Sequence, residues 1–229
     1  MTESHVISTD ALLRLLQITS PALPIGAFAY SHGLEVAVAR GWVIDAESAA
    51  VWIDGLLTTS LGSCDVPSFA RIYRAMAEED DARARFWNDW LFATRGSAEL
   101  AAEDQKLGGA LGRVLASLGV RGARVWGENR RATYAGLFAL AARAFDVPLE
   151  TAVTAYLFVF IEGQVGAAVK LVPLGQTEGQ RILSTLQPGL AQAVRDGLSL
   201  EDGDMTGSLA RHVMASALHE TLYSRLFRS

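Results

Sequence analysis

Residues 152–161, with the sequence AVTAYLFVFI, form the most apolar run in the chain and decide the class of fold. The run meets Glu162, Gln164 and Lys170 well before the roughly 20 apolar residues that a membrane span requires. We therefore expect Leu149–Lys170 to form a buried core helix that does not cross a membrane.

Helical periodicity continues on both sides of this run. Ala and Leu are abundant while Val and Ile are sparse, which favours helix over strand, and no clean alternation of apolar and polar residues predicts a strand. Further helices are expected around Leu12–Ile18, Ser31–Arg40, Val51–Leu57, Ala82–Thr94, Ser97–Leu118, Thr133–Phe145, Gln176–Leu186, Gly189–Arg195 and Leu209–Leu222, and one more is expected to begin at Pro67 after Asp65 as its cap.

These helices predict a single all-α domain over residues 1–229, a helical bundle of about ten helices. Residues 198–207 are expected to form a loop. Residues 1–8 and 223–229 are expected to be flexible tails. Gly108, Gly109 and Gly112 lie inside the long helix and should let another helix approach closely.

The net charge and the single cysteine indicate which partners and which cellular compartment to expect. The formal net charge is −5, which disfavours nucleic acid as a partner. A basic cluster is expected to be a solvated face; its members are Arg121, Arg124, Arg130 and Arg131. The lone Cys64 cannot form an internal disulfide, and Met1–Asp10 is polar and unlike a signal peptide. We therefore expect a cytoplasmic protein.

The sequence lacks the usual signatures of enzymes. There is no GxxxxGK[ST] phosphate loop and no GxSxG elbow, and Ser31 and His32 are adjacent, so their side chains would diverge on a helix. His212 and His219 would stand roughly 10 Å apart along a helix, too far to share a metal ion. We expect no catalytic, cofactor or metal site, although His219 and Glu220 could join a surface site with another chain.

Cys64, Glu162 and Gln164 allow more than one interpretation. Cys64 is expected to be a buried structural cysteine, but a thiolate at a helix start is the alternative. Glu162 and Gln164 interrupt the apolar helix, so they must find partners if they are buried. They could line an internal polar channel or pair with Lys170.

Three segments resemble the urease accessory protein family UreF. The first is Leu15–Glu35, LLQITSPALPIGAFAYSHGLE, the second is Val169–Gln176, VKLVPLGQ, and the third is His219–Ser229, HETLYSRLFRS. The resemblance spans nearly the whole chain. It departs from the family at Arg95–Asp104, RGSAELAAED, where a more highly charged stretch is usual, and at Thr206–Ser208, where a proline is usual.

The resemblance implies a binding and scaffold role. Proteins of this family are all-α homodimers that bind a second accessory protein, UreD (also called UreH). That complex recruits the GTPase UreG and delivers nickel to apo-urease. The UreF-like subunit modulates GTP hydrolysis and is not itself a nucleotide-binding enzyme, so we expect no enzymatic activity and no cofactor.

Partner-binding residues are expected in the three resembling segments. The kinked segment 20–30 and the C-terminal tail carry apolar and aromatic anchors, and the tail is expected to be a main UreD contact that buries Leu226 and Phe227 on the partner. Lys170 and Gln176 are expected to influence the GTPase or the next subunit, unless Lys170 only stabilises a helix end. The candidate partner-binding residues are Leu23, Pro24, Gly26, Phe28, Tyr30, Lys170, Gln176, His219, Glu220, Tyr223, Arg225, Leu226, Phe227 and Arg228.

Two other classes of function remain open at this point. One is a small helical enzyme with Cys64 as nucleophile and Glu162 as base. The other is a helical protein that stores or transports nickel. The few and scattered histidines argue against tight binding of the metal.

Overall fold

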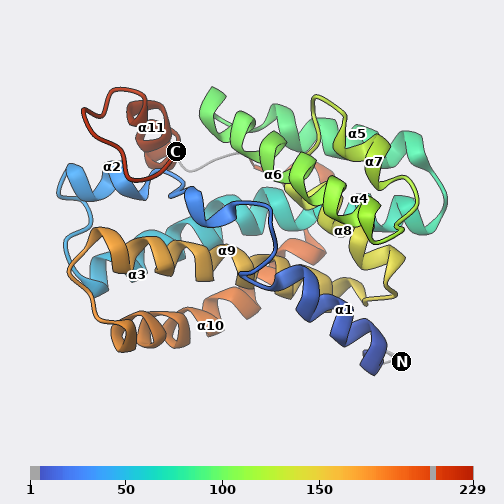
Figure 1. Ribbon diagram of the computed structural model, residues 1–229, viewed down its shortest axis with the longest axis horizontal. Coiled ribbons are helices and arrows are strands. Elements are labelled where there is room, and N and C mark those ends of the chain that lie inside the picture. Colours follow the sequence, from blue (N-terminus) through green and yellow to red (C-terminus); the bar gives the residue numbers. More distant parts are fainter. Residues whose placement is uncertain (1–5, 207–209, 229) are drawn as a thin grey trace.

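The apolar run lies in α9 (Leu149–Leu171), which crosses the middle of the molecule (Figure 1). The computed structural model describes residues 6–206 and 210–228. Within these ranges every regular element is helical, which confirms the expected all-α fold. α9 contacts helices from both ends of the chain, including α1 (Thr9–Thr19), α2 (Leu34–Ala39) and α10 (Gln176–Ser199).

The other helices surround α9 or extend the fold to one side of it. They are η1 (Ala27–Ala29), α3 (Ala46–Leu56), η2 (Leu57–Asp65), α4 (Val66–Ala77), α5 (Asp81–Ala93), α6 (Ala98–Ser117), α7 (Ala123–Gly127), α8 (Tyr134–Ala144), η3 (Asp202–Asp204) and α11 (Ala210–His219). Most begin close to where the sequence predicts. The five-residue α7 was not predicted, and Leu209, the expected start of the last helix, lies outside the described residues.

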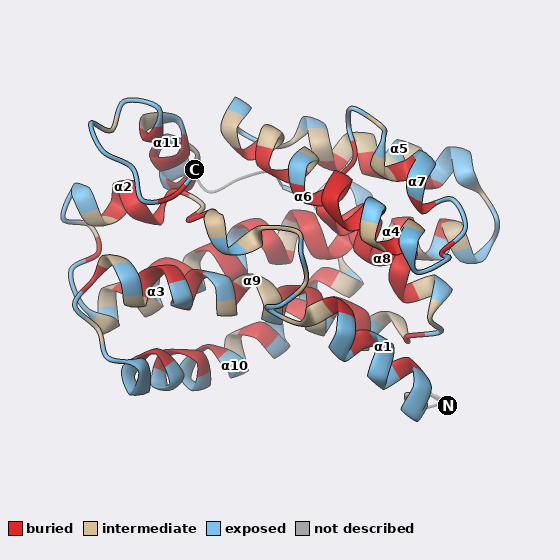
Figure 2. Ribbon diagram, in the orientation of Figure 1, coloured by how far each residue is buried: buried red, intermediate tan, exposed pale blue. Residues whose placement is uncertain are grey.

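Burial confirms that α9 is a core helix. Figure 2 shows buried residues along α9 and along the faces of α3, α4 and α8 that turn toward the interior. Within the described chain, α9 alone is long and apolar enough to cross a membrane by composition, yet half of its most apolar window is buried inside the fold. Such a pattern is typical of the central helix of a globular domain.

The prediction that Asp65 caps a separate fourth helix is wrong. Leu57 and Val66 both have right-handed helical dihedrals, so α3, η2 and α4 run on without a break, and η2 is a π-helical segment of nine residues between them. The Asp65 side chain makes no capping bond. π-helical segments inside α-helices are frequent at functional sites. Here η2 places Ser60, Cys64 and Asp65 beside an internal cavity.

The glycines of α6 serve the close packing that the sequence suggests. A Cβ on Gly112 would lie 2.7 Å from Gly127 Cα, and one on Gly108 would lie 2.9 Å from the backbone of Thr133. These distances are too short for any side chain. α6 therefore packs against the α7 segment and the start of α8 backbone to backbone.

One predicted break is absent. The sequence suggests two helices on either side of Pro188, but α10 is continuous with Pro188 inside it. A proline inside a helix costs about 3 kcal/mol. Leu186 and Leu190 are both buried on either side of it, and we attribute the continuity of α10 to this packing against its neighbours α9, η2 and α3.

Candidate functional site

The three segments that resemble the UreF family meet in space. After α11 the chain turns back, and the backbone N–H groups of Leu226 and Phe227 donate to the Glu35 carboxylate at 2.6 and 3.2 Å. The N–H of Arg228 donates to the carbonyl of Ala29 at 2.8 Å. Figure 1 shows the C-terminal end beside α2. The N-terminal motif therefore holds the C-terminal motif by backbone hydrogen bonds.

The middle segment joins the other two through Lys170. Its ammonium lies 5.6 Å from the centre of the Phe227 ring, a cation–π contact. Lys170 is also in the last turn of α9, where a cation is favoured, so both interpretations of this residue fit its position. Gln176 is exposed at the start of α10. We call the surface formed by residues 20–30, Lys170 and residues 223–228 the docking face.

The C-terminal tail differs from the flexible segment that the sequence suggests. Phe227 is already buried within this chain, so the expectation that a partner buries it is wrong. Tyr223 is fully exposed and Leu226 is 65% exposed. Arg225 donates to the carbonyl of Glu220, which is itself exposed. The apolar and aromatic anchors that remain accessible in the tail are therefore Tyr223 and Leu226, and the side chains of Arg225 and Arg228 are exposed as well.

The kinked segment 20–30 divides its anchors between core and surface. Gly26 has φ +77°, a left-handed conformation that glycine adopts at little cost. Leu23 is half-buried and packs on the core, and Tyr30 is buried. Phe28 is 70% exposed and Pro24 is exposed. Leu23 and Tyr30 therefore pack the segment onto the core, while Phe28 and Pro24 are available to a partner.

His219 is not a surface residue, so the suggestion that it joins an external site is wrong. Its side chain is fully buried, with Nε2 2.8 Å from Glu35 and Nδ1 3.6 Å from Glu99. Burial raises the pKa of Glu99, and the nearby His219 opposes that shift. His219 therefore supports the docking face from inside by positioning the Glu35 carboxylate that holds the tail.

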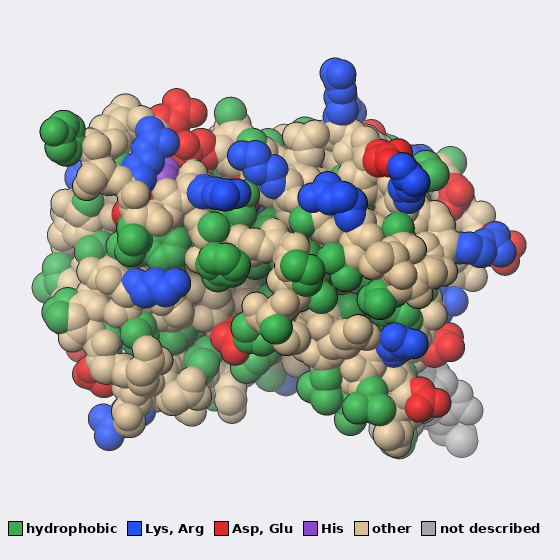
Figure 3. Space-filling view, viewed as in Figure 1, with side chains coloured by type: hydrophobic (Ala, Val, Ile, Leu, Met, Phe, Trp, Pro, Cys, Tyr) green, Lys and Arg blue, Asp and Glu red, His purple; other side chains and the backbone are tan. Residues whose placement is uncertain are grey.

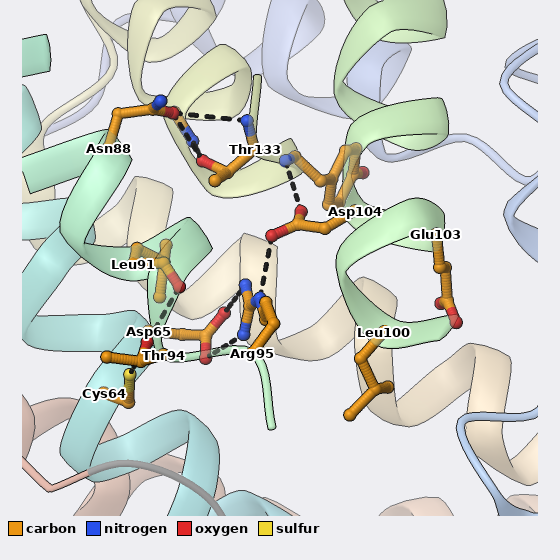
Figure 4. A network of polar contacts seen from close by, with 12 residues as sticks. Cys64, Asp65, Asn88, Leu91, Thr94, Arg95, Leu100, Glu103, Asp104 and Thr133 are labelled. Carbon is orange, nitrogen blue, oxygen red and sulfur yellow. Dashed lines mark hydrogen bonds and ion pairs between the residues drawn. The ribbon is translucent and has the colours of Figure 1, made fainter. Parts of the chain in front are cut away.

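A second polar cluster lies deeper, centred on Arg95 (Figure 4). The Arg95 guanidinium makes two hydrogen bonds to Asp65, at 2.8 and 3.0 Å, and one to Asp104 at 2.8 Å. Asp104 also accepts from the N–H of Tyr134 at 2.6 Å, and the Tyr156 hydroxyl donates to Asp65 at 2.8 Å. The cluster joins η2, the loop after α5, α6, α8 and α9.

Burial and charge shift the pKa values in this cluster in opposite directions. Burial alone would lower the pKa of Arg95, but the carboxylates of Asp104 and Asp65 hold it above its ordinary value. Burial raises the pKa of Asp104, against the effect of Arg95. One guanidinium thus balances two buried carboxylates, and the cluster has formal charge −1 when both are ionised.

This cluster lines a cavity of about 100 Å³ together with His32, Glu103 and His212. His32 Nε2 is 2.9 Å from Glu103. Burial lowers the pKa of His212 to about 3, so the imidazole is neutral near pH 7. The cavity wall carries three carboxyl groups, those of Asp65, Asp104 and Glu103, and one guanidinium, that of Arg95. In the described chain, three or more His, Cys, Asp or Glu side chains nowhere form a cluster fit to hold a metal ion.

Cys64 lies on the wall of the same cavity and is buried, as expected for a structural cysteine. Its sulfur is 3.3 Å from the Thr94 hydroxyl. Burial and the neighbouring Asp65 raise the pKa of the Cys64 thiol to about 11. Since only a thiolate is a good nucleophile, and Glu162 faces a different pocket, the geometry does not support an enzyme that uses these two residues.

Gln164 and Glu162 have separate environments. The Gln164 amide donates to the carbonyl of Ser31 at 3.1 Å and is fully buried, so it joins α9 to the N-terminal motif. Glu162 is half-buried in a pocket beside residues 18–28. The alternative that Glu162 or Gln164 pairs with Lys170 is wrong, because Lys170 lies over the Phe227 ring instead.

Sequence reasoning missed the groups that hold this site together. Glu35 belongs to the first segment that resembles the family, but no local pattern marks it as the group that holds the C-terminal tail. Arg95 and Asp104 lie in the stretch that departs from the family. A signal was present for Asp104, because Leu100, Asp104 and Leu107 share one helix face, where a carboxylate among leucines predicts a buried partner. No spacing rule predicts that Asp65 reaches the same arginine.

Comparisons of the sequence with known proteins identify the family. The UreF family model matches residues 43–187. The urease accessory protein UreF of Alkalilimnicola ehrlichii is 47% identical over 216 residues, covering 94% of this chain and 95% of that protein. UreF of Chromohalobacter salexigens is 47% identical over 220 residues, with 96% and 95% covered. UreF of Thermosynechococcus vestitus is 41% identical over 225 residues, with 98% and 100% covered. Since both the family match and the identity extend over most of the chain, the protein belongs to the UreF family of urease accessory proteins.

Proposed function

We propose that this chain is a non-catalytic, cytoplasmic subunit of the complex that matures urease. In this role it binds a UreD-like (UreH-like) accessory protein as a homodimer and recruits a UreG-like GTPase. It modulates GTP hydrolysis and helps to deliver nickel to apo-urease. The observation that carries the proposal is the convergence of the three motif segments on one docking face around Glu35.

The docking face has the chemistry of a protein interface. It presents exposed aromatic and aliphatic side chains, with Phe28, Tyr223 and Leu226 as the accessible anchors. Anchors of this kind dominate the binding energy when a partner buries them. A fixed backbone under the tail lowers the entropy that binding would cost.

The chemistry of the interior cavity supports the nickel part of this proposal. The cavity wall carries Asp65, Asp104 and Glu103 against Arg95, together with a neutral His212. Such an excess of carboxylate attracts divalent cations. This supports a role in nickel delivery, with the metal as cargo.

A deletion of Tyr223–Ser229 tests the proposal. We expect the truncated chain to keep its helical circular dichroism but to lose the complex with a co-expressed UreD-like protein, because Tyr223 and Leu226 are removed. Since the deletion also removes the buried Phe227, the double variant Tyr223→Ala with Leu226→Ala is the sharper form of the test.

The matched control is Val125→Ala, which trims a side chain on α7 that is about as exposed as Leu226 and lies at the other end of the molecule from the C-terminus (Figure 1). We expect the control to bind the partner like the unaltered chain. The double variant should bind at least ~10-fold more weakly, as for loss of interface anchors. Equal binding by all variants would contradict a partner contact through the tail.

A further inference from the structure

A pocket of about 240 Å³ lies between residues 18–28 and the outer side of α9. Ile18, Leu23 and Ile25 form one wall. On α9, a Cβ added at Gly163 or Gly166 would meet no atom within 4 Å, so the helix is notched at this point. Figure 3 shows hydrophobic side chains gathered over the middle of this face, above α9 and the segment in front of it.

Two charged side chains line this pocket, which we call the Glu162 pocket. Among the described residues, the Glu162 side chain makes no hydrogen bond or ion pair, and burial raises its pKa. The second charged residue, Lys170, is already over the Phe227 ring. It lies eight residues further along α9, which is about 12 Å in an α-helix. The Glu162 carboxylate is therefore half-buried without a cation.

An unpaired carboxylate beside apolar walls selects a particular kind of ligand. Arginine and lysine side chains have an apolar stem that can cover the walls and a cationic head that can pair with the carboxylate. An apolar side chain would leave Glu162 desolvated and unpaired, which is costly. An acidic side chain would be repelled.

We propose that the Glu162 pocket receives an arginine or lysine side chain of the UreD-like partner. The inference rests on the proposed function, and it names the chemistry that this partner must present. Phe28 lines the pocket and is 70% exposed, while the neighbouring Ala29 accepts the hydrogen bond from Arg228 of the tail. The pocket is thus continuous with the docking face, and one partner can cover both.

The test measures the affinity of the full chain for the co-purified UreD-like protein by biolayer interferometry. Glu162→Gln keeps the shape of the side chain and removes its charge. We expect it to weaken binding by at least ~10-fold and to make binding less sensitive to salt, as for loss of one partner of a desolvated ion pair. The matched control is Glu150→Gln, which removes an exposed carboxylate from the first turn of the same helix and should leave affinity unchanged.

A second variant tests the pocket without changing charge. At Gly166 a Cβ meets no atom within 4 Å, and the pocket of about 240 Å³ that Gly166 lines leaves room for the rest of a leucine side chain. In Gly166→Leu the fold should therefore persist while partner binding falls at least ~10-fold. If Glu162→Gln and Gly166→Leu both bind the partner like the unaltered chain, the pocket inference is overturned and the proposed function stands. If the unaltered chain does not bind the partner, both fail. If the variants instead abolish self-association of the isolated chain, the occupant is a second copy and the inference is also overturned.

Discussion

Arg95 is the residue on which the interior polar cluster depends, because it is the cation between Asp65 and Asp104. In Arg95→Ala both carboxylates stay buried without their cation. We expect the free energy of unfolding to fall by about 3–5 kcal/mol, the usual cost of breaking a buried pair. Urea denaturation followed by circular dichroism measures this directly.

The control for Arg95 is Arg83→Ala. Arg83 pairs with Glu78 on the surface, and both side chains are substantially exposed. Because solvent screens such pairs, the loss should be no more than about 1 kcal/mol. Similar losses in the two variants would show that the Arg95 cluster contributes no more than a surface pair.

His212 predicts a specific pH dependence of stability. Its pKa falls to about 3 in the folded chain, below the ordinary value of 6.5. Below pH 6.5 the unfolded chain therefore takes up a proton that the folded chain does not, so acidification favours unfolding. Between about pH 6.5 and 4.5, the free energy of unfolding should fall relative to His212→Asn by up to about 1.4 kcal/mol per pH unit. Parallel pH profiles for the two proteins would contradict the buried neutral imidazole.

For single residues, the sequence predicts some local environments, but it does not predict contacts between residues that are far apart in the chain. The burial of Cys64 agrees with the expectation of a structural cysteine, which rests on the lack of a clear His or Lys partner for a thiolate in the sequence. The positions of His219 and Phe227 did not, because a polar or terminal residue is buried only when a distant group meets it, and Glu35 lies far away in the chain. Helical spacing carries no information about such contacts.

Among the helices, the contact of α6 with the α7 segment depends on glycine. Gly112→Ala would place a methyl group 2.7 Å from Gly127 Cα, so the helices must separate and we expect a loss of about 1–3 kcal/mol. Gly163→Ala in α9 meets nothing within 4 Å and should instead be stabilising by about 0.5–1 kcal/mol. Thermal unfolding of both variants checks the sign, and a stabilised Gly112→Ala would refute the close packing.

Helix boundaries were predictable where local chemistry decides them, as at Ser97, whose hydroxyl accepts from the N–H of Leu100. They were not predictable where packing overrides local preference. Pro188 remains inside α10. Asp65 lies in a continuous helix because the π-helical η2 joins α3 to α4. Both exceptions are set by neighbouring helices that a local pattern does not contain.

In the whole molecule, the apolar α9 and the motif at each end of the chain were enough to predict the fold class and the family. The sequence did not reveal that the two ends form one surface. That surface arises because α2 and α11 lie side by side in contact and Glu35 holds the returning tail. Long-range pairing of this kind is visible only in the folded chain.

The most direct test of the docking face is co-expression of the full chain with a UreD-like protein, followed by size-exclusion chromatography with light scattering. We expect a stable complex with about two copies of each protein, as for a symmetric homodimer that binds one partner per subunit. A chain that elutes alone beside a well-folded UreD-like protein would contradict it.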